Sequence, residues 1–127
     1  MNPPIPNVLF EMAGLAIRNA APDTPPAERA SELGLSAAIL AIAGEVWDRQ
    51  AHILVEENRA IRVLLSEEGE DADLRLSVLK VENDRLRAAL IQAHAAAEAA
   101  GDRERQSAIW AELVRSTERR RISSAPA

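Results

Sequence analysis

The feature that most constrains the fold is a stretch without proline, from Ala27 to about Glu67, in which seam residues recur in steps of four and three. The seam positions are Leu40, Gly44, Trp47, Ala51, Leu54, Asn58, Ile61 and Leu65. This spacing is typical of a helix that pairs with another helix along one seam, as in a coiled coil. A helix of about 40 residues would be roughly 60 Å long, whereas a compact chain of this length has a radius of gyration of about 14 Å. We therefore expect either a break at Gly34 or Gly44, or an elongated molecule that associates.

A second seam of the same kind follows, and an acidic segment separates the two. The second seam consists of Leu76, Leu79, Asn83, Leu86, Leu90, Ala93 and Ala97. The segment from Glu67 to Asp73 holds five acids and Gly69, a composition typical of a solvated turn. The sequence therefore predicts an all-α fold, an elongated antiparallel helical hairpin of the helical-bundle or coiled-coil-like kind.

Short additional helices are expected at the two ends of the chain. Helical spacing runs from Ile5 to Ala21, and Pro22 ends that first helix. Gly101 followed by Asp102 is typical of a helix C-cap and then an N-cap, which opens a last helix. We expect one helical domain over residues 1–122 and a disordered tail over residues 123–127.

Composition supports the helical class and excludes several kinds of chemistry. The aromatic residues are Trp47, Trp110 and Phe10, so the core must be built from aliphatic side chains and alanine. The absence of cysteine excludes disulfides, thiol catalysis and cysteine-bound zinc. The longest apolar run, from Leu33 to Gly44, is shorter than the roughly 20 residues needed to span a bilayer. We therefore expect a cytoplasmic protein without a membrane segment, and the abundance of arginine and alanine suggests a bacterial source.

An internal repeat connects the two seams. Residues 53–65 align without gaps on residues 78–90, with identities at Leu54/Leu79, Glu57/Glu82, Asn58/Asn83, Arg62/Arg87 and Leu65/Leu90. The alternative is that any helix with leucine every seven residues acquires such a pattern without duplication. An asparagine on a seam fixes helix register at a cost in stability. A turn centred between Glu70 and Asp71 would place Asn58 level with Asn83, and a turn displaced by two residues would separate them.

Two polar groups are candidates for chemistry. Asp48, His52 and Glu56 are four residues apart and share a helix face, and His94 and Glu98 have the same spacing. Carboxylates and imidazoles on facing helices can bind metals, so His52, Glu56 and His94 are weak metal candidates. Exposed i,i+4 polar pairs are the ordinary explanation, and we expect no metal and no cofactor.

The other candidate is the basic cluster Arg119-Arg120-Arg121, with Arg115 upstream. It would suit nucleic acid or an acidic partner, but cations at a helix C-terminus are favoured by the helix dipole alone. The net charge of -5 argues against a general nucleic-acid binder.

These observations predict a structural or protein-interaction bundle that self-associates as a dimer, with or without a further protein partner, and has no catalytic activity. The supporting feature is that Ile39, Ile42, Val46 and Ile53 widen the apolar face beyond what one partner helix covers. The interaction residues are expected to be Trp47, Leu54, Asn58, Ile61, Asn83, Leu86 and Trp110. The alternatives are a ligand- or metal-binding bundle that assists an enzyme, and a small DNA-associated regulator.

Overall fold

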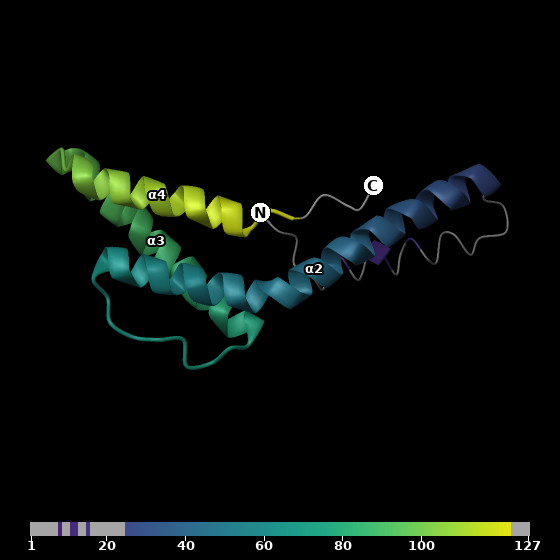
Figure 1. Cartoon of the computed structure of the whole chain (residues 1–127), viewed down its shortest axis with the longest axis horizontal. Coiled ribbons are helices and arrows are strands. Elements are labelled where there is room, and N and C mark those ends of the chain that lie inside the picture. Colours follow the sequence, from purple (N-terminus) through teal and green to yellow (C-terminus); the bar gives the residue numbers. More distant parts are fainter. Residues whose placement is uncertain (1–7, 9–10, 13–14, 16–24, 123–127) are drawn as a thin grey trace. The chain divides into compact units, whose positions relative to one another are not determined.

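A computed structural model describes Val8, Glu11, Met12, Leu15 and residues 25–122 of the chain (Figure 1). These residues form helices and no strand, so the all-α class is confirmed. The long elements are α2 (Pro26–Leu65), α3 (Leu76–Ala100) and α4 (Arg103–Arg119). Val8, Glu11, Met12 and Leu15 are helical, as expected for the first helix. The rest of that helix and the tail over residues 123–127 lie outside the described residues.

The chain divides into two compact units. One holds residues 1–48 and 122–127, and the other holds residues 49–121. Helix α2 contributes to both and is one uninterrupted α-helix, so neither Gly34 nor Gly44 breaks it. A glycine inside a helix costs only about 1 kcal/mol relative to alanine, which the helix-forming residues around each glycine outweigh. The single domain over residues 1–122 stays a prediction.

Helices α3 and α4 form an antiparallel hairpin in the second unit (Figure 1). Gly101 ends α3 in the left-handed conformation, with φ of 68°, which glycine adopts without steric cost. The Asp102 carboxylate then accepts a hydrogen bond from the backbone N–H of Arg105 and caps α4. The predicted C-cap and N-cap are both confirmed.

The part of α2 from Arg49 to Leu65 runs in the same direction as α3, and residues 66–75 return between them (Figure 1). Ile61 is buried in one cluster with Leu86, Leu90 and Ile109, and Leu65 packs against that cluster. Packing between long helices is therefore as expected, but the antiparallel hairpin is α3–α4, and Leu65 lies near Leu90 rather than level with Leu76. The physical reason is the connection. Ten residues can span about 33 Å when extended, and the 17 helical residues that they must pass cover only about 26 Å.

Candidate functional site: a buried polar layer

Polar side chains interrupt the apolar core of the second unit. Among the described residues, the buried polar ones are Glu57, Asn58, Arg62, Asn83, Glu112 and Ser116. They come from all three long helices, and the seam spacing that predicts the apolar core also carries the two asparagines inward. An unpaired polar group in such a place costs stability. The hydrogen-bond partners of these buried side chains therefore show what the layer does.

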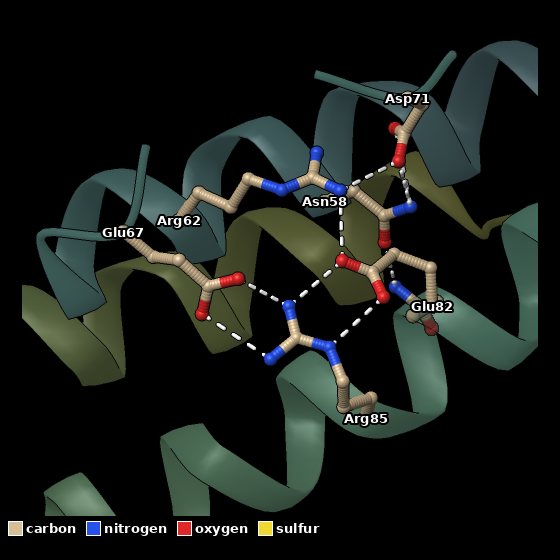
Figure 2. A network of polar contacts seen from close by, with 7 residues as sticks. Asn58, Arg62, Glu67, Asp71, Glu82 and Arg85 are labelled. Atoms are coloured by element: carbon tan, nitrogen blue, oxygen red, sulfur yellow. Dashed lines mark hydrogen bonds and ion pairs between the residues drawn. The ribbon is translucent and has the colours of Figure 1, made fainter. Parts of the chain in front are cut away.

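The two repeat asparagines are directly bonded. Asn83 Nδ2 donates to Asn58 Oδ1 over 3.0 Å. Asn58 Nδ2 in turn donates to the carboxylate of Asp71, at 3.1 and 3.2 Å. Asp71 belongs to the acidic connection, so this predicted solvated turn sends one side chain, 5% exposed, back into the bundle. Figure 2 shows the contact between Asn58 and Asp71.

Arg62 joins the same carboxylate to α3. Its Nη2 donates to Asp71 Oδ1 over 2.8 Å and to Glu82 Oε1 over 2.9 Å. The hydrogen bond that Arg62 donates to Asp71 is the main reason why the pKa of Arg62 lies above its ordinary value. Hydrogen bonds from Arg85 and then from Arg62 lower the pKa of Glu82 to about 2. Arg62 and Glu82 therefore stay charged over the physiological pH range.

The ion pairs between α2 and α3 are reciprocal with respect to the repeat. Glu57 binds Arg87, and Glu82, its counterpart in the second copy, binds Arg62, the counterpart of Arg87. In each case the acid pairs with an arginine that lies five residues beyond the acid's own counterpart on the other helix. In a parallel coiled coil this is the pattern made by charged residues that flank the seam, and a seam asparagine faces its own counterpart. The repeat positions thus act as pairing positions of two helices that run in one direction.

Helix α4 enters the layer through Arg120. Its guanidinium donates to Glu57 Oε2, with Nε at 3.1 Å, and Nη2 reaches Asn83 Oδ1 at 3.4 Å. The Glu57 side chain is only 1% exposed. Burial alone would raise the pKa of this carboxyl, but hydrogen bonds from Arg120 and Arg87 hold it below its ordinary value. Glu57 is therefore a buried anion between two cations.

The basic cluster is largely occupied by contacts within the chain. Arg115 and Arg119 both bind Glu112, which is buried, and Arg121 binds Glu118. The Arg49 guanidinium donates to the backbone carbonyls of Arg119 and Arg121 at 3.1 and 3.2 Å. It therefore satisfies carbonyl groups that the end of α4 leaves free.

The structure places the predicted interaction residues in two different settings. Five of them are buried inside the second unit: Leu54, Asn58, Ile61, Asn83 and Leu86. The other two, Trp47 and Trp110, are 66% and 57% exposed. The seam spacing does not predict that Glu57, Arg62 and Arg120 belong to the layer. In each repeat copy the arginine follows the acid by five residues, and this spacing could have indicated that Glu57 and Arg62 take part.

The predicted metal candidates do not converge on a site. His52 is exposed, and Glu56 forms a surface ion pair with Arg59. His94 contacts Trp110 edge-on, with ring centroids 5.9 Å apart. Within the described residues, no three histidine or carboxylate side chains are close enough to hold a metal ion.

An apolar pocket opens on the surface of the second unit. Its lining is Arg87, Leu90, Ile91, His94, Ile109 and Leu113.

Helix α2 contains a stretch with a mean hydropathy of 1.3 that is 7% buried. By length and composition alone, this helix could cross a membrane.

The fold and the polar layer define a small helical bundle in which two similar helices pair in parallel through a seam of leucine, isoleucine and asparagine. No family model, curated protein or solved structure matches the chain.

Proposed function

We propose that the protein is a structural or protein-interaction module, a helical bundle that self-associates and has no catalytic activity of its own. The observation that carries the proposal is the exposure of both tryptophans, 66% for Trp47 and 57% for Trp110. Tryptophan is enriched at the energetic centres of interfaces. Covering about 100 Å² of one indole is worth about 2.5 kcal/mol.

The state of the buried polar layer supports the same proposal. Glu57, Asn58, Asn83 and Glu112 each bond to neighbouring side chains. Such saturated groups fix how helices pair. They present no side chain to a substrate, so the layer gives no support to a catalytic role.

The proposal is tested by the solution mass of the full chain. We expect sedimentation equilibrium to give a species of twice the 13.8 kDa chain mass. Tryptophan emission should shift to shorter wavelength as concentration rises, because association covers the indole rings. A single monomeric species throughout the micromolar range, with emission independent of concentration, would refute self-association.

A further inference from the structure

The outward face of α4 is an exposed surface of the second unit. We call it the α4 outer face and define it as Arg103, Ser107, Trp110, Val114, Glu118 and Arg121, all of which are exposed. The steps of three and four between these residues place them in one stripe along the helix. Ile109, Glu112 and Ser116, on the opposite side of α4, are buried.

Charged residues lie at both ends of this face, on either side of an apolar centre. Arg103 and Glu104 lie in the first turn, and Glu118 and Arg121 lie at the end, with Trp110 and Val114 between them. Within the described part of the chain, Arg103 and Glu104 have no ion-pair partner. Arg103 is therefore available to an acid of another copy, and Glu118, which pairs with Arg121 of its own chain, is the acid at the other end of the face.

An antiparallel second copy can bring Arg103 opposite Glu118. If the centre lies between Trp110 and Ala111, Arg103 of one copy is level with Glu118 of the other, and Trp110 is level with Ala111. The small alanine leaves room for the indole ring. A parallel arrangement would instead place Arg103 against Arg103 and Glu118 against Glu118, which like charges disfavour.

We infer that the α4 outer face is the surface through which two copies of this chain pair, with their α4 helices antiparallel. This inference rests on the proposed function and names its surface and its partner. Helix α4 has 17 residues, which corresponds to about 26 Å. A contact of that length is at the low end of specific interfaces, so the dimer dissociates in the micromolar range.

The first experiment measures the dimer dissociation constant of full-length variants by sedimentation equilibrium. Trp110→Ala raises the constant at least about tenfold, as expected for a central tryptophan. Val114→Ala also raises it, whereas Val81→Ala does not. Val81 lies on α3 and is 70% exposed, against 59% for Val114, so it is the matched control. Circular dichroism melts establish that each variant is folded.

The second experiment tests the direction of pairing by charge reversal. Arg103→Glu and Glu118→Arg each raise the dissociation constant several-fold, and the double variant returns it to within about twofold of the unaltered chain. If the single reversals weaken the dimer and the double variant does not recover, the antiparallel arrangement is wrong.

The outcomes separate this inference from the proposed function. A dimer that withstands both Trp110→Ala and Val114→Ala forms through another surface, so the inference fails while self-association stands. An unaltered chain that is monomeric refutes both.

Discussion

Removing the negative charge of Glu57 tests whether the buried polar layer holds the helices of the second unit together. Glu57→Gln keeps the size of the side chain but leaves Arg87 and Arg120 without a carboxylate, and it turns an amide N–H₂ toward one of them. Breaking a buried ion pair typically costs 3–5 kcal/mol. Arg87 and Arg120 are 40% and 28% exposed and can regain water. We therefore expect a loss of about 2–3 kcal/mol in the free energy of unfolding.

Glu56→Gln is the matched control, because the same change one residue earlier removes a surface pair. That pair joins side chains that are 38% and 70% exposed, and such pairs contribute at most about 1 kcal/mol. The assay is urea unfolding followed by circular dichroism, with the slope of each transition checked to be unchanged. The reasoning is refuted if the free energies of unfolding of Glu57→Gln and Glu56→Gln differ by less than about 0.5 kcal/mol, which is about the precision of such a comparison.

Three further predictions concern charge, the asparagine pair and backbone conformation. Glu82 has a folded-state pKa of about 2 against 4.5 ordinarily, so its stabilising contribution is complete above pH 4.5 and is lost as the pH falls toward 2. Carboxyl NMR titration should place its midpoint near 2, and a midpoint near 4.5 would contradict the ion pairs. Asn58→Leu or Asn83→Leu alone leaves a buried amide without its partner and lowers the free energy of unfolding by about 1–3 kcal/mol. The double variant should be more stable in urea than either single variant. If the two losses of stability simply add in the double variant, the asparagines are not directly coupled. Gly101→Ala should lower the free energy of unfolding by about 1 kcal/mol, because the φ of 68° at this position is unfavourable for alanine. Gly44→Ala adds a Cβ that meets nothing within 4 Å and should stabilise α2 by about 0.5–1 kcal/mol. Thermal melts in which both variants shift the melting temperature in the same direction would contradict this account.

Helix positions and caps were predictable because they depend on local chemistry. The stretch from Ala27 to about Glu67 became α2 (Pro26–Leu65), and Gly101 and Asp102 end one helix and begin the next. Capping, dihedral preference and side-chain spacing act within a few residues. They can therefore be evaluated along the sequence alone.

The direction in which α2 pairs with α3 was not predictable from seam spacing, because leucine every seven residues packs in either direction. The acidic connection between α2 and α3 was compatible both with a tight turn and with an extended return over ten residues. Charge spacing contained the missing information. Glu57 and Arg62, and likewise Glu82 and Arg87, are five residues apart, which permits reciprocal ion pairs only when the helices are parallel.

Long-range partners outside the repeat could not be inferred in this way. Arg120 reaches Glu57 from a distance of 63 residues in the chain, and nothing in the spacing of the arginine cluster distinguishes Arg120 from Arg119 or Arg121. The antiparallel return of α4 selects it, because that return places the end of α4 beside Asn83.

The two repeat copies are alike in pairing positions, so a copy on another chain could in principle replace either one. Residues that occur once per chain remove this equivalence. Asp71 bonds to Asn58 and not to Asn83, while Arg120 bonds to Glu57 and reaches Asn83. In a parallel pairing of residues 53–65 with the same segment of a second chain, each Glu57 would again lie beside Arg62 of the other copy, but Arg120 would have no copy of Asn83 to reach. The polar layer thus directs the repeat toward pairing within the chain, and this leaves association to surfaces such as the α4 outer face.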